Sequence, residues 1–167
     1  TAAVGTPTSL VTVDANGDGD VDVVVGGSAG LAILLNAGID SSASSPLAGP
    51  GVLLAVGVPG VTMLTAADLS GSGSASDLVW LSSGSQSVYL ATINESATSP
   101  SAVYASHGEV ALGSDPTTIC VGELNSNTIS DVVVAMANGT ILALVDGNGS
   151  NMLVLGTDLA GPIPRGA

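Results

Sequence analysis

An acidic, glycine-rich loop occurs at three places in this chain, and its spacing limits the folds the chain can adopt. In the first copy, oxygen-bearing side chains stand at Asp14, Asn16, Asp18 and Asp22, and Asp20 lies between the last two. Hard cations such as Ca²⁺ take six to eight oxygen ligands, so closely spaced carboxylates on such a loop suit one ion. The loop is therefore a candidate calcium site.

Two weaker copies of the loop follow. The second consists of Asp68, Ser70, Ser72 and Asp77, and the third of Glu123, Asn125, Asn127, Ile129 and Asp131. The first acids of the three loops are 54 and then 55 residues apart. The chain is therefore a three-fold repeat, and fixed periods of this length indicate a repeat architecture.

Each unit carries four short apolar runs. They are 9–13, 23–25, 31–35 and 52–56; 61–67, 78–81, 87–93 and 109–112; and 117–121, 132–136, 140–145 and 152–155. Short runs rich in Val and Ile, bounded by Gly, Asn and Ser, indicate strands. The second run of each unit is apolar at successive positions, which predicts burial on both faces of the sheet. The sequence predicts an all-β chain of stacked four-stranded antiparallel sheets, of the propeller-blade type.

Three pieces of the first unit together resemble the FG-GAP and VCBS repeat families. They are the Gly5-Thr6-Pro7 opening, the loop 14–22, and the Val-Asp-Val-Val-Val-Gly-Gly segment that follows. The resemblance covers roughly residues 5–157 and is strongest in the first unit. It implies β-propeller blades, of the kind found in the integrin α-subunit head, whose acidic loop joins the first two strands and holds calcium. By this resemblance, calcium would be ligated by the side chains of Asp14, Asn16, Asp18 and Asp22 and by the backbone carbonyl of Asp20.

The resemblance sets the expected organisation of the chain. We expect a single repeat domain over 1–167, with blades at about 6–57, 58–113 and 114–157, a detached edge strand at 1–5 and an extended, Pro-rich arm at 158–167. Three blades cannot close a propeller ring, and an open stack would expose an apolar sheet at each end. We therefore expect a homo-oligomer: either two copies close a ring, or a head-to-tail contact repeats into a filament. The alternative is a piece trimmed from a longer propeller.

The second and third loops depart from the calcium pattern. The second has serines at Ser70 and Ser72 and one extra residue before Asp77, so it lacks the charge to bind an ion tightly. The third keeps two charges, with Ile129 at the carbonyl position. The alternative for all three loops is that Asp and Asn side chains cap a tight hairpin without metal.

Charge excludes several partners. A net charge of −13, with one Arg and no Lys, argues against nucleic acid and against an anionic membrane surface. No apolar run approaches the roughly 18 residues of a membrane span. His107 is the only side chain suited to act as a base at neutral pH, so we expect no enzymatic activity.

Other single residues have plain alternatives. The sequons at Asn94, Asn138 and Asn148 are candidates for glycosylation, although Asn-Gly hairpin turns explain the last two without a sugar. Trp80 and Tyr89 are expected to form a packed pair, the alternative being a sugar-stacking platform.

Two further placements follow from the strand pattern. Cys120 lies in an apolar run, which predicts a buried small hydrophobe. Tyr104 and His107 are expected in the loop before the fourth strand of the second unit.

These expectations together favour an extracellular, secreted structural or adhesive protein that calcium stabilises and that self-assembles through its blade faces and terminal strands. The alternative is a lectin-like or protein-ligand-binding module.

Overall fold

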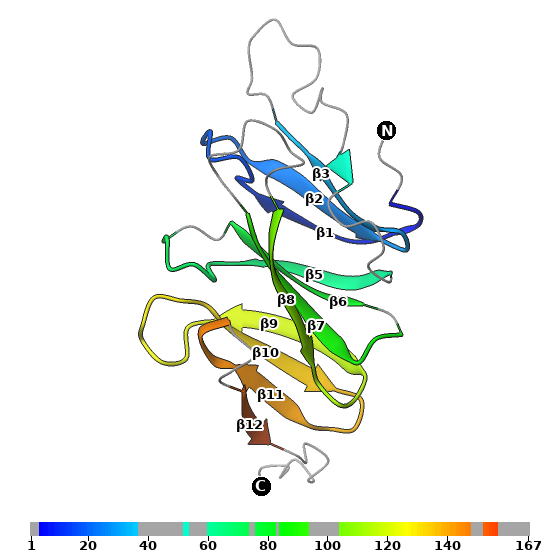
Figure 1. Cartoon of the computed structure of the whole chain (residues 1–167), viewed down its shortest axis with the longest axis vertical. Helices are drawn as coiled ribbons and strands as arrows, with labels where there is room; N and C mark the ends of the chain where they lie inside the picture. Colours follow the sequence, from blue (N-terminus) through cyan, green and yellow to red (C-terminus); the bar gives the residue numbers. More distant parts are fainter. Residues whose placement is uncertain are drawn as a thin grey trace, which may run out of the picture.

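The structure, a computed structural model, describes residues 4–36, 52–53, 60–73, 76–82, 84–93, 104–147 and 152–156. These residues form an all-β fold of three four-stranded antiparallel sheets. Figure 1 shows the sheets stacked along the long axis of the molecule in chain order. The prediction of an all-β chain with three four-stranded antiparallel units is confirmed.

Each sheet is built from strands that are consecutive in the chain. Sheet A contains β1 (Pro7–Val13), β2 (Asp22–Gly27), β3 (Gly30–Leu34) and β4 (Val52–Leu53); sheet B contains β5 (Val61–Ala67), β6 (Asp77–Ser82), β7 (Ser87–Ile93) and β8 (Tyr104–Ala111); sheet C contains β9 (Pro116–Gly122), β10 (Asp131–Met136), β11 (Ile141–Leu144) and β12 (Met152–Gly156). A short 3₁₀ turn, η2 (Val145–Gly147), follows β11.

Sheet B lies between the other two and is buried on both faces. One apolar cluster joins it to sheet A through residues that include Val24, Ile33 and Trp80. A second joins it to sheet C through residues that include Val79 and Val132. All six residues of β6 are buried, which confirms the predicted two-sided burial for this strand.

In the outer sheets, the second strand is fully buried on one face only, whereas successive residues of the third strands, β3 and β11, are buried. In β2 and in β10, fully buried residues alternate with half-buried ones. Side chains alternate between the two faces of a strand, so the half-buried positions belong to the face turned away from sheet B. The predicted full burial of β2 and β10 on both faces is therefore wrong, because no fourth sheet lies over the outer faces of sheets A and C among the described residues.

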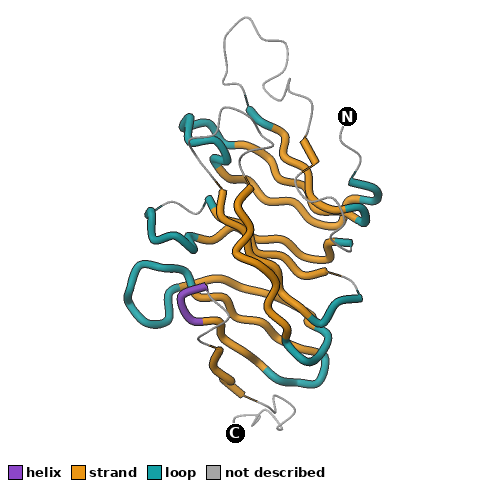
Figure 2. The backbone as a smooth tube through the Cα atoms, in the orientation of Figure 1, coloured by secondary structure: helices purple, strands orange, loops and turns teal. Residues whose placement is uncertain are grey.

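The first strands of the sheets, β1, β5 and β9, are neighbours across the stack. Figure 2 shows them running through the molecule in adjacent layers. A Cβ added to Gly26 in β2 would lie 2.6 Å from a Val61 Cγ1 in β5. Sheets A and B therefore approach so closely here that only glycine fits.

Two local predictions are wrong. Tyr104 and His107 lie in β8, not in a loop, because Gly108 (φ 109°) allows the strand to continue through a shift in register. Cys120 is exposed, because it occupies the outer face of sheet C.

The predictions for the chain ends are not tested. Residues 1–3 and the arm at 158–167 lie outside the described residues. Of the expected edge strand at 1–5, Val4 accepts a hydrogen bond from the backbone N–H of Ala29 (2.8 Å), which ties it to the β2–β3 turn.

Candidate functional site

The three acidic loops connect the first and second strands of their sheets, β1–β2, β5–β6 and β9–β10. Figure 1 shows all three projecting from the same side of the stack. The repeat therefore gathers the predicted site residues along one edge of the molecule.

The first loop is organised by its own carboxylates. Asp14 accepts hydrogen bonds from the backbone N–H groups of Gly17 (2.8 Å) and Gly19 (2.9 Å). Asn16 Nδ2 donates to Asp18 Oδ2 (2.9 Å), and Asp18 Oδ1 accepts from the N–H of Asp20 (2.8 Å). These bonds are the Asx-type capping that was the metal-free alternative for the loop.

The last acid of each loop is fully buried and has a structural role. Asp22, Asp77 and Asp131 each have no exposed surface. Each accepts a hydrogen bond from the backbone N–H of the residue after the loop's first acid, at 2.8, 2.7 and 2.6 Å respectively. A buried carboxylate bonded in this way fixes the two ends of the loop to each other.

All three loops have positive φ at the third and fifth residues after their first acid, although their sequences differ. The first loop has positive φ at Gly17 (74°) and Gly19 (88°), and the third has positive φ at the equivalent Ser126 (64°) and Thr128 (72°). A β-branched residue with positive φ is strained. Thr128 holds this conformation while its N–H donates to Glu123 Oε2 (2.6 Å).

The pKa values of three loop carboxyls depart from their ordinary range. Burial raises the pKa of Asp22, and the nearby charges of Asp18 and Asp14 raise it further, against the hydrogen bonds that lower it. For Asp68 and Glu123, desolvation raises the pKa, but backbone N–H donors outweigh it and hold both pKa values below the ordinary range. The negative charges of Asp14 and Asp18 therefore disfavour ionisation of the buried Asp22 carboxyl.

The second and third loops are bonded to each other. The backbone N–H of Asp68 donates to Ser130 Oγ (3.0 Å), and the N–H of Ser130 donates to the carbonyl of Asp68 (2.7 Å). A Cβ added to Gly71 would lie 3.3 Å from a side-chain carbon of Ile129. Ile129, predicted only as a carbonyl ligand, therefore also packs its side chain against the neighbouring loop.

Two residues that complete the loops were not predicted from the sequence. The backbone N–H groups of Asn36 and Asp146 donate to Asp22 (2.6 Å) and Asp131 (2.7 Å), respectively. Asp146 Oδ1 also accepts hydrogen bonds from the amides of Asn125 (2.7 Å) and Asn127. The available signal was a polar residue shortly after the third apolar run of the first and third units.

The donor chemistry of the first loop fits a hard cation, although its side chains are not gathered around one point. The loop holds four carboxylates and one amide oxygen, and the described residues include no Lys or Arg to neutralise them. An ionised carboxylate has about four acceptor sites, so Asp14 keeps capacity beyond its two N–H donors. Within the described ranges, no three acidic, His or Cys side chains converge as a metal site would require.

The remaining candidates are placed only in part. Asn138 is exposed in the β10–β11 turn, where its Oδ1 accepts the N–H of Thr140 (3.0 Å). Asn94 and Asn148 lie outside the described residues. Trp80 is fully buried and stacks on Tyr89, with ring centroids 5.5 Å apart, which confirms the packed pair.

No protein-family model and no curated protein matches the chain. The resemblance to FG-GAP and VCBS repeats therefore stays a prediction that rests on the residues quoted above. Within the described part of the chain, no helix has the length and apolar character needed to cross a bilayer.

Proposed function

We propose that the protein is a structural repeat subunit that assembles with further copies of itself through the outer faces of sheets A and C. The observation that carries this proposal is the unequal burial of one repeated position. Leu10, Leu64 and Ile119 each stand four residues before the first acid of their loop. Leu64 and Ile119 are 6% and 7% exposed, whereas Leu10 is 67% exposed.

We call the outer face of sheet A, with Leu10, Val23 and Val25, the N-face. Val23 and Val25 stand one and three residues after the last acid of their loop, as Leu78 and Trp80 do in sheet B. Leu64, Leu78 and Trp80 all belong to the cluster that packs sheet B against sheet A. The N-face is thus equivalent to a face that, one unit later, is part of the core.

We call the outer face of sheet C, with Cys120, Val133 and Ala135, the C-face. Val133 is half-buried, whereas its equivalents Val24 and Val79 are fully buried against the next sheet. Burying apolar surface contributes roughly 25 cal/mol per Å², so two such faces on one chain favour association. Because the N-face and the C-face differ, the contact between copies is heterologous, and it closes into a ring or extends into a filament.

The test is the mass of the 167-residue chain in solution as a function of concentration, by light scattering and sedimentation. We expect assemblies that dissociate on dilution, and a Leu10→Asp variant that stays monomeric at concentrations where the unmodified chain assembles. Leu124→Asp is the matched control, because Leu124 is another exposed leucine (55%) but lies in the third loop, away from both faces. A monodisperse monomer at all concentrations would refute the proposal.

We also propose that Ca²⁺ binds the first loop and stabilises the subunit, with Asp14, Asn16, Asp18, Asp20 and Asp22 as its ligand-bearing residues. The support is the charge of the loop: the negative charges of Asp14 and Asp18 help to raise the pKa of buried Asp22, and a cation would offset that repulsion. Such a role suits an extracellular protein, because extracellular modules bind calcium at about 10⁻⁴–10⁻³ M.

Thermal unfolding with and without calcium tests this second proposal. At a free calcium concentration about 100 times the dissociation constant, binding adds about 2.7 kcal/mol to the free energy of unfolding. Asp14→Asn should abolish the calcium-dependent shift, whereas Asp115→Asn, an exposed acid outside the loops, should retain it. An unfolding temperature that is the same in calcium and in EDTA would refute the proposed stabilisation by calcium.

The lectin-like alternative has less support. Its candidate platform was the pair Trp80 and Tyr89, and Trp80 is fully buried between sheets A and B. A glycan array would separate the two functions, since a structural subunit has no saturable sugar ligand.

A further inference from the structure

One hydrogen bond between sheets recurs along the stack. The backbone N–H of Leu64 donates to Ser9 Oγ (3.1 Å), and the N–H of Ile119 donates to the Met63 sulfur (3.3 Å). Ser9 and Met63 each stand five residues before the first acid of their loop, and Leu64 and Ile119 each stand four residues before it. The same two positions of the repeat therefore join sheet A to sheet B and sheet B to sheet C.

If the stack continued by one sheet at each end, the same two positions of the repeat would supply one further hydrogen-bond acceptor and one further donor. The next acceptor is Thr118, which is exposed and whose hydroxyl donates to the Met63 sulfur (3.5 Å). A hydroxyl has two acceptor lone pairs besides its one donor, so Thr118 can still accept. The next donor is the backbone N–H of Leu10, on β1 at the edge of sheet A.

A threonine precedes this acceptor position in every sheet. Thr8, Thr62 and Thr117 each stand six residues before the first acid of their loop. The Thr8 hydroxyl lies within hydrogen-bonding reach of the Gly26 carbonyl (3.2 Å) in its own sheet and of the Val61 carbonyl in sheet B. Thr8 thus adds a second side-chain contact from sheet A to sheet B, next to that of Ser9.

Thr117 repeats the bond that Thr8 makes within its own sheet. Its hydroxyl donates to the Ala135 carbonyl (2.9 Å), and Ala135 and Gly26 stand at the same position after the last acid of their loops. The outer sheets carry two hydroxyls at this pair of positions, Thr8-Ser9 and Thr117-Thr118, whereas in sheet B the second position is Met63. Thr117-Thr118 on β9 therefore reproduces the pair by which sheet A holds sheet B.

The first unit also has a backbone carbonyl equivalent to the Val61 carbonyl, which lies within reach of the Thr8 hydroxyl. Val61, whose carbonyl lies within reach of Thr8, stands seven residues before the first acid of its loop, and the equivalent residue of the first unit is Pro7. Pro lacks a backbone N–H but keeps its carbonyl acceptor. A second copy could therefore meet Thr117 with the Pro7 carbonyl and Thr118 with the Leu10 N–H.

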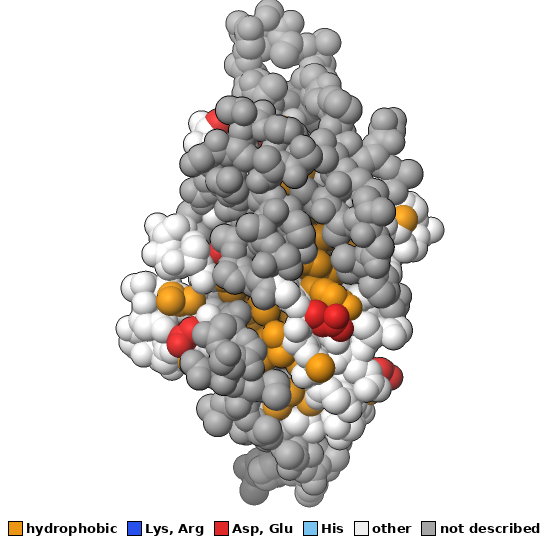
Figure 3. All heavy atoms as spheres, viewed as in Figure 1, with side chains coloured by type: hydrophobic (Ala, Val, Ile, Leu, Met, Phe, Trp, Pro, Cys, Tyr) orange, Lys and Arg blue, Asp and Glu red, His pale blue; other side chains and the backbone are white. Residues whose placement is uncertain are grey.

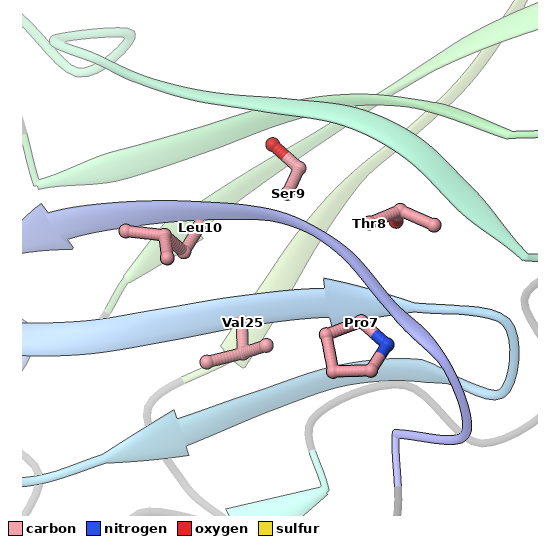
Figure 4. A pocket seen from close by; sticks show the side chains of 5 residues that line it. All are labelled: Pro7, Thr8, Ser9, Leu10 and Val25. Carbon is pink, nitrogen blue, oxygen red and sulfur yellow. The ribbon is translucent and has the colours of Figure 1, made fainter.

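The N-face has a hollow where a neighbouring sheet would pack. A cavity of about 310 Å³ is lined by Pro7, Thr8, Ser9, Leu10 and Val25. Figure 4 shows Ser9 directed toward β5, while Pro7 and Val25 lie beside each other on the other side of β1. Val25 occupies the position of Trp80, which in sheet B fills this space against sheet A.

No charged residue is among those that define the two faces. The residues that define them, Leu10, Val23 and Val25 on one side and Cys120, Val133 and Ala135 on the other, are all apolar or uncharged, in a chain with a net charge of −13. Figure 3 shows acidic side chains at intervals on the surface of the described residues, beside a band of hydrophobic ones. None of these six residues therefore adds like-charge repulsion to the contact.

We infer that Thr117 and Thr118 form a docking site for β1 of a second copy, in a head-to-tail contact that repeats the internal packing of sheet A on sheet B. In this contact the Thr118 hydroxyl accepts a hydrogen bond from the Leu10 N–H, the Thr117 hydroxyl shares its proton between the Ala135 and Pro7 carbonyls, and the C-face packs into the N-face hollow. The inference rests on the proposed self-assembly and specifies its partner, polarity and register.

The polarity is tested by mixing two variants that each retain one face. Leu10→Asp keeps the C-face, and Ala135→Glu, at a half-buried site on β10, keeps the N-face. Each variant alone should be monomeric, and an equimolar mixture should form a heterodimer and nothing larger. Dimers of either variant alone would show a contact between like faces and overturn the inference, as would efficient Cys120–Cys120 cross-linking in the unmodified assembly.

The register is tested with Thr117→Val/Thr118→Val, which keeps the side-chain shape and removes both hydroxyls. Because a buried donor and acceptor would lose their partners, we expect the dissociation constant of the assembly to rise at least about tenfold. Thr140→Val, in the β10–β11 turn, should leave it unchanged, and far-ultraviolet circular dichroism should show that all variants fold.

The outcomes separate the two proposals. If the unmodified chain is monomeric, self-assembly itself is wrong. If it assembles but the double valine variant assembles equally well, self-assembly stands and the docking site is wrong.

Discussion

Truncating the three equivalent residues Leu10, Leu64 and Ile119 to alanine should separate the energetics of the subunit from those of its assembly. Leu64 and Ile119 are almost fully buried, so each truncation should lower the free energy of unfolding by about 2–5 kcal/mol, including the cavity that it leaves. Leu10 is 67% exposed, so its truncation removes only about a third of a leucine's burial, or about 0.5–1 kcal/mol.

When association is measured instead of unfolding, the order of the three effects should reverse, and Leu10→Ala should have the largest effect. Docking would bury the remaining two thirds of Leu10, which corresponds to about 1–2 kcal/mol and to a roughly five- to thirty-fold weaker assembly for Leu10→Ala. Urea denaturation at a concentration where the chain is monomeric gives the first quantity, and sedimentation equilibrium gives the second. If Leu10→Ala costs the monomer as much as Leu64→Ala, or leaves association unchanged, the assignment of the N-face is wrong.

Three further outcomes are expected. Gly26→Ala, which brings a Cβ to 2.6 Å from a side-chain carbon of sheet B, should destabilise by about 1–3 kcal/mol in urea denaturation, whereas Gly122→Ala, where a Cβ meets nothing within 4 Å, should not. Thr128→Gly should stabilise by about 0.5–1 kcal/mol in the same assay, because relief of the positive φ exceeds the added entropy of the unfolded chain. The lowered pKa values of Asp68 and Glu123 contribute stability that is present above their ordinary values of 3.8 and 4.5 and is lost as pH falls through the folded values. Unfolding followed from about pH 6 to about pH 3 should therefore show a loss of stability that is shallower in Asp68→Asn, and an equally steep loss in that variant would contradict this account.

The strands could be predicted from the sequence because their signal is local. The successive apolar residues of β6 indicated burial on both faces, and all six residues are buried. The same pattern in β2 and β10 predicted burial on both faces, which these strands do not show in the described chain. Apolar residues in a strand indicate which surfaces the strand can pack against, but not whether a neighbouring sheet is present. Cys120 was misplaced for the same reason.

The loops were predictable in position but not in detail. The acids marked where β1–β2, β5–β6 and β9–β10 turn. The positive φ at Ser126 and Thr128 could not be predicted, because neither residue favours it on its own. Nor could the contribution of Asp146, since it reaches Asn125 from 21 residues away through the pairing of β10 with β11.

The recurrence of one contact at Ser9–Leu64 and Met63–Ile119 also bears on how such a chain can change in length. A duplication or deletion of one 54- or 55-residue unit would join sheets through positions that already fit each other, so no new interface would have to arise. Unequal recombination between units could then yield subunits with more or fewer sheets that keep the same two end faces. If copies assemble as proposed, subunits of different length would remain compatible with one another, and the dimensions of the assembly could vary without loss of its contacts.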